Sequence, residues 1–349
     1  MAFLLCPVQL MAQYNGYKDW PRDERQLTGK YLLTDEATLL ADKILEFQLP
    51  SGGWPMNIYY PQVASTDVQT LRKKYQEENR GTIENSATLS EIHFLSNMFQ
   101  ATALRRYRKA AEQGIQFLLD TQYPNGGWPI CFPSKTDRDG QISFAGENMV
   151  NVLALLHDIS QKKEPYSYLS DDLRTRVEEA FQKGLACILN AQCRQQGKPT
   201  VWCAQHDAQT LAPVAASPLE PAALSGNESA PIVLLLMGIT NPDAFVREAI
   251  EGAVTWFQTV AIKGMKRENY INKEGKRDYR LIPDVHAADM WARFYSLEDN
   301  QPFFTSENGE KVQGYEDLSR NRRTSISWYS NEPQRVLRRY ERWKQKLQN

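Results

Sequence analysis

An internal repeat of about 70 residues constrains the fold of this chain more than any other feature. The copies are four segments with apolar residues at helical spacing: residues 41–48, 111–122, 181–192 and 249–260. Three of them align on a glycine, Gly114, Gly184 and Gly252, at spacings of 70 and 68 residues. Apolar residues at i, i+3, i+4 and i+7 predict an amphipathic helix in each copy. The internal glycine favours close helix packing.

A Gly-Gly-Trp-Pro turn follows the first two copies, in LPSGGWP (49–55) and YPNGGWP (123–129). Glycine supplies the positive φ that ends a helix, and proline prevents the helix from continuing. Each turn therefore predicts the start of a crossover. Trp54 and Trp128 have two interpretations, namely packing of the crossover or an aromatic platform for the C–H face of a sugar ring. The second interpretation makes Trp128 a candidate substrate-binding residue.

More apolar segments alternate with these helices: residues 86–104, 147–159 and 226–238. Strand-like alternation is scarce, so each unit predicts an outer helix, a turn-rich crossover and a buried inner helix. Several such hairpins in a ring give an all-α fold, an α/α toroid or incomplete α/α barrel with long crossover loops. We expect one domain over residues 20–345 without an internal linker.

The charges of the chain nearly cancel, since 41 basic and 42 acidic residues give a formal net charge of −1. No overall field attracts nucleic acid or an anionic membrane, so we expect neither as a partner. No apolar stretch of the sequence reaches membrane-spanning length. We expect a monomer that binds any anionic ligand through local charges.

The N-terminal residues MAFLLCPVQLMA (1–12) are apolar and end in a small residue. They are typical of the end of a secretory signal without its basic region, and they predict a truncated signal peptide and a secreted or periplasmic protein. The alternative is a buried N-terminal segment. Four cysteines remain beyond this segment, which is too few for a disulfide scaffold: Cys131, Cys187, Cys193 and Cys203.

Each inner helix is preceded by a segment that pairs an Asn with a Glu: GTIENSAT (81–88), SFAGENM (143–149) and LSGNES (224–229). Helix capping explains much of this pattern, with Asn85 as a cap and Ser225 with Glu228 as a capping box. The functional alternative is that the three helix N-termini converge on one cleft, where carboxylates hold a divalent cation.

Two arginines stand in aromatic surroundings. Arg293 lies between Trp291 and Phe294, and Arg322 lies in the segment LSRNRRTSISW (318–328). A guanidinium group recognises a carboxylate through a bidentate pair of hydrogen bonds. Both arginines are therefore candidates for binding an acidic ligand.

The segment VWCAQHD (201–207) adds a histidine to the candidate site. His206 is the histidine of the chain with a polar, loop-like and aromatic-flanked context, which suits a general base. Trp202 in the same segment is a candidate substrate contact.

Taken together, QLPSGGWP, TIENSATLSEIHFL, QYPNGGWP, VWCAQHD, LEPAALSGNES, WARFY and RRTSISW resemble the family 10 pectate lyases. The motifs keep the family's order from about residue 35 to residue 340. The resemblance implies an α/α toroid, a secreted bacterial protein, calcium as cofactor, and cleavage of polygalacturonate by β-elimination.

Residue by residue, the resemblance implies roles for several side chains. Arg293 and Arg322 match arginines that bind the substrate carboxylate in this family. Asn85 matches the Asn of the family's Ile-Asp-Asn motif and becomes a candidate substrate-binding residue.

The calcium ligands of the family are altered. Glu84 replaces an Asp, which keeps the charge on a longer side chain. Gly146 occupies the position of a second Asp, so only the adjacent Glu147 offers a carboxylate there. The resemblance thus implies Glu84 and Glu147 as metal ligands.

The position of the catalytic base is altered as well. The family reads Ala-Arg-x-x-Glu before LSGNES, and the arginine is its proposed base, whereas this chain has Ser217 at that position. His206 or one of the arginines is then a candidate substitute.

Three functions stay open at this point. The first is a calcium-dependent polyuronide lyase, and the second is a binder of acidic glycans that has lost the base. The third is a glycoside hydrolase, which needs two carboxylates facing each other across the cleft, such as Glu84 with Glu147 or Glu228.

Overall fold

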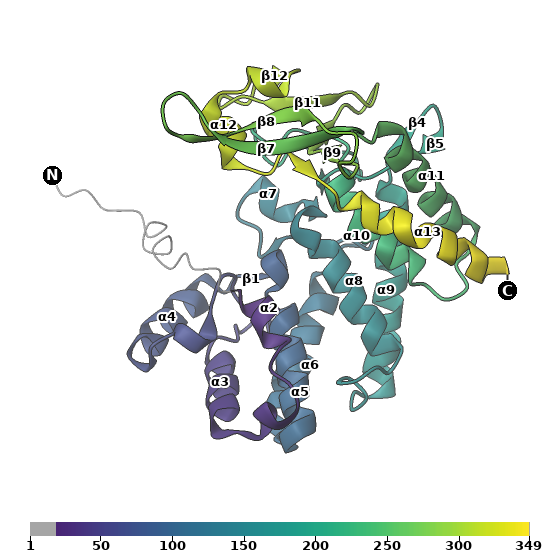
Figure 1. The fold of residues 1–349 in the computed structure, drawn as a ribbon. Helices are drawn as coiled ribbons and strands as arrows, with labels where there is room; N and C mark the ends of the chain where they lie inside the picture. Colours follow the sequence, from purple (N-terminus) through teal and green to yellow (C-terminus); the bar gives the residue numbers. More distant parts are fainter. Residues whose placement is uncertain (1–18, 349) are drawn as a thin grey trace. The chain divides into compact units, whose positions relative to one another are not determined.

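The computed structural model describes residues 19–348, drawn as a ribbon in Figure 1. They divide into two compact units, one ending at Leu118 and the other beginning at Leu119. The division falls inside a continuous helix, α6 (Arg105–Thr121), so no linker separates the units. The expected single domain over residues 20–345 stays a prediction, and the predicted signal segment 1–12 lies outside the described residues.

The first unit is mainly helical. Its elements are α2 (Trp20–Glu24), η2 (Gly29–Leu33), α3 (Asp35–Glu46), η3 (Tyr60–Gln62), α4 (Ser65–Glu78), β1 (Gly81–Thr82), η4 (Glu84–Ser86), α5 (Leu89–Thr102) and most of α6. The Thr34 side chain caps α3 by accepting a hydrogen bond from the backbone N–H of Ala37. The inner helix α5 packs against α2, α3 and η2, and it contributes Ile92 and Phe94 to the core.

The second unit combines long helices with short strands. Its helices are α7 (Asp137–Gly140), η5 (Ala145–Glu147), α8 (Asn148–Ser160), α9 (Asp171–Ala191), α10 (Gly226–Met237), α11 (Ala244–Val260), η6 (Tyr315–Asp317), α12 (Arg320–Ser325) and α13 (Pro333–Gln348). Its strands are β2 (Cys131–Phe132), β3 (Ile142–Ser143), β4 (Arg194–Gln195), β5 (Lys198–Pro199), β6 (Gln205–His206), β7 (Met265–Ile271), β8 (Arg277–Pro283), β9 (Trp291–Ala292), β10 (Phe294–Tyr295), β11 (Pro302–Thr305), β12 (Lys311–Val312) and β13 (Tyr329–Ser330).

The predicted helical hairpins are confirmed. The four repeat segments lie on the outer helices α3, α6, α9 and α11, and the more apolar segments lie on the inner helices α5, α8 and α10. Within the second unit, α8 packs against both α9 and α10, as a buried inner helix should.

The glutamine at the end of three repeat copies joins one outer helix to the next. Each donates to one carbonyl of its own crossover and to one carbonyl of the following outer helix, at 2.8 to 3.0 Å. The sets are Gln48 with Gly52 and Ala110, Gln122 with Gly126 and Ala180, and Gln192 with Thr200 and Ala249. A buried carbonyl without a hydrogen-bond donor destabilises the folded state. This explains why three copies of the repeat carry a glutamine at the same position.

Two of the three repeat glycines make room for the tryptophan of the preceding turn, and the third, Gly252, packs against Pro199. A Cβ atom at Gly114 would lie 2.8 Å from the Trp54 ring, and one at Gly184 would lie 2.9 Å from the Trp128 ring. The two tryptophans are 0% and 1% exposed. The packing interpretation is therefore the correct one, and the expectation that Trp128 offers a stacking surface to a sugar is wrong, because its ring is covered by protein.

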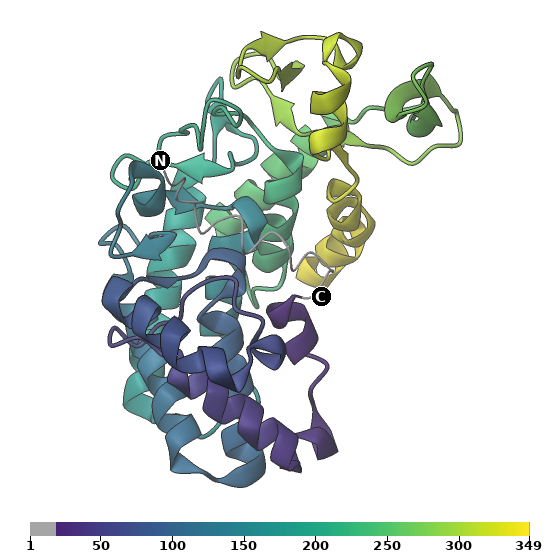
Figure 2. The same cartoon turned by 90° about the vertical axis from the view of Figure 1, so that its left-hand side faces the viewer.

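One hairpin departs from the expectation that strands are scarce. Strands β7 and β8 pair antiparallel over seven residues each, from Met265 opposite Pro283 to Ile271 opposite Arg277. Figure 2 shows this hairpin at the edge of the second unit. Charged residues interrupt the alternation of apolar residues, which explains why the sequence did not predict it.

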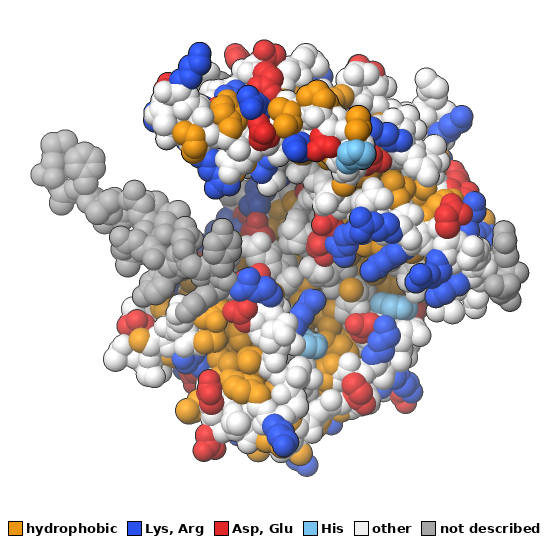
Figure 3. All heavy atoms as spheres, viewed as in Figure 1, with side chains coloured by type: hydrophobic (Ala, Val, Ile, Leu, Met, Phe, Trp, Pro, Cys, Tyr) orange, Lys and Arg blue, Asp and Glu red, His pale blue; other side chains and the backbone are white. Residues whose placement is uncertain are grey.

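The surface agrees with a nearly neutral chain. On the face drawn in Figure 3, basic and acidic side chains are interspersed. Among residues 19–348, no helix has both the length and the apolar character needed to cross a bilayer.

Candidate functional site

The two candidate arginines lie against one aromatic cluster of the second unit, which we call the Trp328 cluster. Its buried members are Ala223, Phe294, Phe303, Phe304, Tyr315, Leu318 and Trp328. The rings of Phe294 and Phe304 meet the Trp328 ring edge to face, at centroid distances of 5.9 and 5.4 Å. Rigid aromatic packing of this kind holds the side chains above it in fixed positions.

Arg322 is the buried arginine of the pair, with 7% of the residue exposed. Its Nε atom donates to the Thr305 carbonyl at 2.8 Å, and Nη2 donates to Thr305 Oγ1 at 2.8 Å and to the Leu219 carbonyl at 3.3 Å. The guanidinium lies 4.9 Å from the centre of the Trp328 ring. Ser319 caps the short helix α12 through the backbone N–H of Arg322. Arg322 therefore ties three segments of the chain together.

Arg293 is the accessible arginine. It stands between β9 and β10, where its backbone N–H donates to the Trp328 carbonyl at 2.8 Å. Its side chain is 27% exposed, and Nη2 lies 2.7 Å from Oε1 of Glu220, whose side chain is 42% exposed. Arg293 is thus accessible from solvent, and Glu220 is the partner of its guanidinium in the free protein.

A tight turn from Ser217 to Glu220 completes the site. The backbone N–H of Glu220 donates to the Ser217 carbonyl at 3.0 Å, and Ser217 is exposed. The Leu219 carbonyl accepts from both Arg322 and Thr305 Oγ1. The position where the family resemblance implies a base therefore lies on the turn that both arginines contact.

The electrostatics follow from this arrangement. Burial lowers the pKa of Arg322, and the positive charge of Arg293 lowers it further, against the opposing effects of Glu220 and Glu307. The two guanidinium groups and Glu220 thus form one interacting group of charges. Glu220 was not predicted, although it stands three residues after Ser217, where the family pattern has a Glu.

His206 is not placed to act as a base. It is buried, its Nδ1 lies 2.8 Å from the Leu211 carbonyl, and its Nε2 accepts from the backbone N–H of Cys203 at 3.3 Å. Burial lowers its pKa. With both ring nitrogens bonded to backbone, His206 braces its loop, which contradicts our expectation.

Trp202 is equally covered. Its indole is 0% exposed and donates from Nε1 to the Ile188 carbonyl at 2.8 Å. The Ser229 hydroxyl accepts from the Trp202 backbone N–H at 2.9 Å, which attaches the inner helix α10 to the crossover. The predicted contact between Trp202 and a substrate is therefore wrong, because the ring is buried in the core.

The three segments before the inner helices differ in detail. Asn85 is exposed, has φ 53°, and donates from Nδ2 to Asn57 Oδ1 at 3.1 Å. The predicted capping box before α10 is not formed, because the Ser225 hydroxyl donates to the Glu228 carboxylate and caps no backbone N–H. Glu228 is buried beside that serine.

The two predicted calcium ligands, Glu84 and Glu147, stay a prediction. Within the part of the chain that the structure describes, no three His, Cys, Asp or Glu side chains come together to hold a metal ion. Glu84 belongs to the first unit and Glu147 to the second. Calcium takes about six to eight oxygen ligands. Two carboxylates supply fewer oxygen atoms than that, so a calcium ion bound by Glu84 and Glu147 would need further ligands, such as carbonyl oxygens, water or a bound anion.

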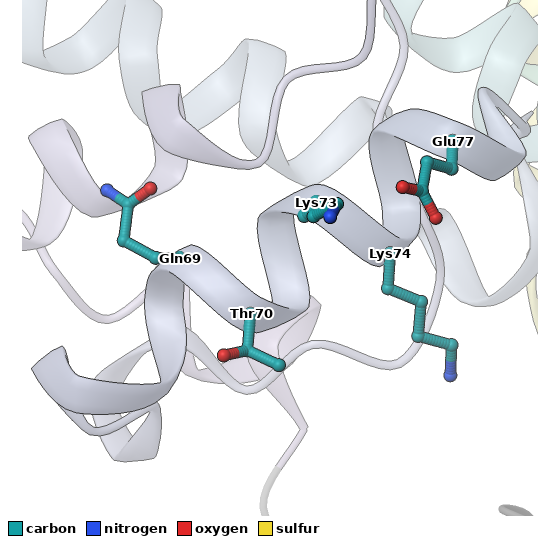
Figure 4. A pocket seen from close by; sticks show the side chains of 5 residues that line it. All are labelled: Gln69, Thr70, Lys73, Lys74 and Glu77. Carbon is teal, nitrogen blue, oxygen red and sulfur yellow. The ribbon is translucent and has the colours of Figure 1, made fainter.

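A surface depression of the first unit lies along helix α4 (Figure 4). Its lining side chains, Gln69, Thr70, Lys73, Lys74 and Glu77, all project from that single helix. None of the predicted site residues lines this depression. Arg293 and Arg322, which lie against the Trp328 cluster, therefore remain the candidate site.

Comparison with known proteins supports the expected family. A family model described as pectic acid lyase matches residues 48–337. The structure is similar to a family 10 polysaccharide lyase from Cellvibrio cellulosa, at 29% identity and a TM-score of 0.77, with 93% of this chain and 95% of that chain covered. A mutant of a family 10 polysaccharide lyase from the same organism, in complex with trigalacturonic acid, gives the same identity and coverage and a TM-score of 0.76. A search of curated proteins finds no match. The similarity confirms the predicted fold class, the all-α toroid class of helical hairpins.

Proposed function

Since the chain belongs to the pectic acid lyase family, we propose that it is a polysaccharide lyase that acts on polygalacturonate or a related acidic polysaccharide. The observation that carries this proposal is Arg293, a partly exposed guanidinium fixed on an aromatic cluster. A related lyase binds trigalacturonic acid, whose carboxylates are suited to such a group.

The two arginines have different roles in this proposal. Arg293 binds a substrate carboxylate directly, in competition with Glu220, which is its partner in the free protein. Arg322 has its Nε and Nη2 donors committed to Thr305 and Leu219, and it positions the turn and the strand that frame the site. We expected both arginines to contact the substrate. In this proposal only Arg293 does so, and Arg322 is a positioning residue.

β-Elimination requires a proton acceptor. The C5 proton of the uronate leaves to a base, the C4–O4 bond breaks, and a C4–C5 double bond forms in the product. Charge grows on the carboxylate as the proton leaves, and a fixed guanidinium such as that of Arg293 stabilises it. Ser217 cannot supply the basicity of an arginine, and His206 is enclosed by backbone groups, so the acceptor is unassigned.

We also propose that the protein acts outside the cell, where such a polymer is accessible, and that it is a monomer. Calcium and the contribution of Glu84, Asn85 and Glu147 remain part of the proposal. Because the carboxylates of Glu84 and Glu147 alone do not supply about six oxygen ligands, calcium would need further ligands, for which substrate carboxylates are suited, and we derive no step through it.

A second candidate function is favoured by Ser217 itself. A chain that keeps the carboxylate-binding arginine and lacks the base would bind acidic glycans without cleaving them. The two functions share a site and differ in whether an unsaturated product forms.

The deciding experiment measures the ultraviolet absorbance of the unsaturated uronide with polygalacturonate in added calcium, and again after chelation. A chelator-sensitive rise supports a lyase whose base lies elsewhere than position 217. A flat trace with trigalacturonate binding in calorimetry supports the binder. Ser217→Arg, with Ser217→Ala as its matched control, then tests whether the base alone is missing, because only the arginine variant should gain product formation.

A further inference from the structure

Two cysteines of the second unit lie in contact. The sulfur atoms of Cys193 and Cys203 are 3.7 Å apart. Cys203 is buried and Cys193 is partly accessible. A disulfide needs a sulfur separation of about 2.05 Å, so the two atoms would have to move closer by about 1.6 Å to bond.

The backbone around the pair already has the geometry of a closed loop. The carbonyl of Cys193 accepts from the backbone N–H and the hydroxyl of Thr200, both at 2.8 Å, and its N–H donates to the Val201 carbonyl at 3.1 Å. Strands β4 and β5 form a hairpin between the two cysteines. The fold thus holds the ends of this loop together without help from the sulfurs, and a bond between them would add little strain.

A thiolate metal centre is a poorer explanation of the contact. Structural metal sites with thiolate ligands use about four ligands. In residues 19–348, no third His, Cys, Asp or Glu side chain completes a metal-binding group around the two sulfurs. Two thiols without further ligands therefore fit a redox site better than a metal site.

We propose that Cys193 and Cys203 form a disulfide when the protein meets a disulfide oxidant such as oxidised glutathione. The Cys193 thiolate attacks one sulfur of the oxidant and releases the first thiol. The Cys203 sulfur then attacks the sulfur of Cys193 in the mixed disulfide and releases the second thiol. In total the protein loses two protons and two electrons, and the oxidant gains them as it becomes two thiols.

The order of these steps follows from the environment of the sulfurs. The contact with Cys203 lowers the pKa of the Cys193 thiol, whereas the same contact and burial raise the pKa of Cys203. The more acidic thiol is thus the more accessible one, as the attacking residue should be.

The disulfide would stabilise a series of paired backbone segments that ends next to the candidate site. Cys203 pairs with Leu224, and Leu224 pairs with Tyr295 through hydrogen bonds of 2.9 and 3.0 Å. Leu224 follows Glu220 by four residues, and Tyr295 follows Arg293 by two residues. The disulfide would therefore lie one bridge away from the segment that follows Glu220 and two bridges away from β10, which follows Arg293.

The test uses the full chain, oxidised with glutathione disulfide, denatured, alkylated and digested without reductant. We expect a linked peptide that contains Cys193 and Cys203, alkylation of Cys131 and Cys187, and a Tm about 4 °C above that of the reduced protein. In Cys193→Ser, the oxidant should leave the Tm unchanged.

Two results would overturn the proposal. One is alkylation of both Cys193 and Cys203 after oxidation, which would mean that the sulfurs do not bond. The other is a lasting glutathione adduct on Cys193 in place of the linked peptide, which would mean that Cys203 cannot reach it. Peptide mapping of the unmodified chain reads both outcomes without relying on a variant that must fold.

Discussion

Replacing the two site arginines one at a time separates binding from positioning. Arg322→Ala removes two buried hydrogen bonds of 2.8 Å, a partly buried one of 3.3 Å, and the contact with the Trp328 ring. Hydrogen bonds to a charged group contribute about 1.5–3 kcal/mol each, less the cost of burying the charge. We expect the free energy of unfolding to fall by about 3 kcal/mol.

Arg293→Ala should behave in the opposite way. Its side chain has one ion pair, with a partner that is 42% exposed, and such pairs contribute about 0.2–1 kcal/mol after solvent screening. Stability should therefore fall by less than about 1 kcal/mol. If Arg293 meets a substrate carboxylate, the loss of that contact should weaken trigalacturonate binding by about 10-fold or more.

The chain supplies a matched control in Arg280→Ala. Arg280 pairs with Glu268 at 2.7 Å, the distance of the Arg293–Glu220 pair, but on the exposed hairpin β7–β8. Urea denaturation and titration calorimetry on the three variants give stability and affinity separately. Equal affinity of the Arg293 and Arg280 variants would refute the binding role, and unchanged stability of Arg322→Ala would refute the positioning role.

Three further predictions concern the site, the pH response and the repeat. Glu220→Gln should tighten trigalacturonate binding by about 2-fold to 5-fold, because it removes the carboxylate that competes for Arg293; weaker binding in calorimetry would contradict this competition. Burial raises the pKa of Glu91 to about 7, so its contribution to stability is full below about pH 4.5 and is lost as the pH rises through 7. Urea titrations of Glu91→Gln should show a flatter stability between pH 5 and 8 than the unmodified chain, and an unchanged slope would refute the raised pKa. Gly184→Ala should cost about 1–3 kcal/mol because its Cβ would lie 2.5 Å from Leu153, whereas Lys183→Ala on the exposed side of the same helix should be nearly neutral.

The repeat made most of the fold predictable, because its periodicity determines helices before any contact is known. The outer and inner helices all appear where the apolar spacing placed them. The functions of the repeat glutamine and tryptophan could not be predicted in the same way, since their partners lie about 60 residues further along the chain. Only the packed structure brings Gln122 to Ala180 and Trp128 to Gly184.

The site was less predictable because burial decides its chemistry. His206 and Trp202 stand in a segment that reads as an exposed polar loop, yet both are fully covered. Arg293 and Arg322 looked alike in sequence, and the structure separates them by exposure and by the number of their partners. Glu220 could have been found from its spacing to Ser217, but its role appears only in its contact with Arg293.

The absence of an arginine at position 217 also bears on Arg322. Like charges that lie close together disfavour each other's charged form, and Arg293 lowers the pKa of Arg322 in this way. A third guanidinium on the turn that carries Glu220 would add to this effect on Arg322. With Ser217 in its place, the repulsion on Arg322 is weaker, and its guanidinium keeps its proton more firmly than it would beside a third positive charge. Its donors are also committed to Thr305 and Leu219, so Arg322 suits the positioning role and is a poor candidate for the proton acceptor.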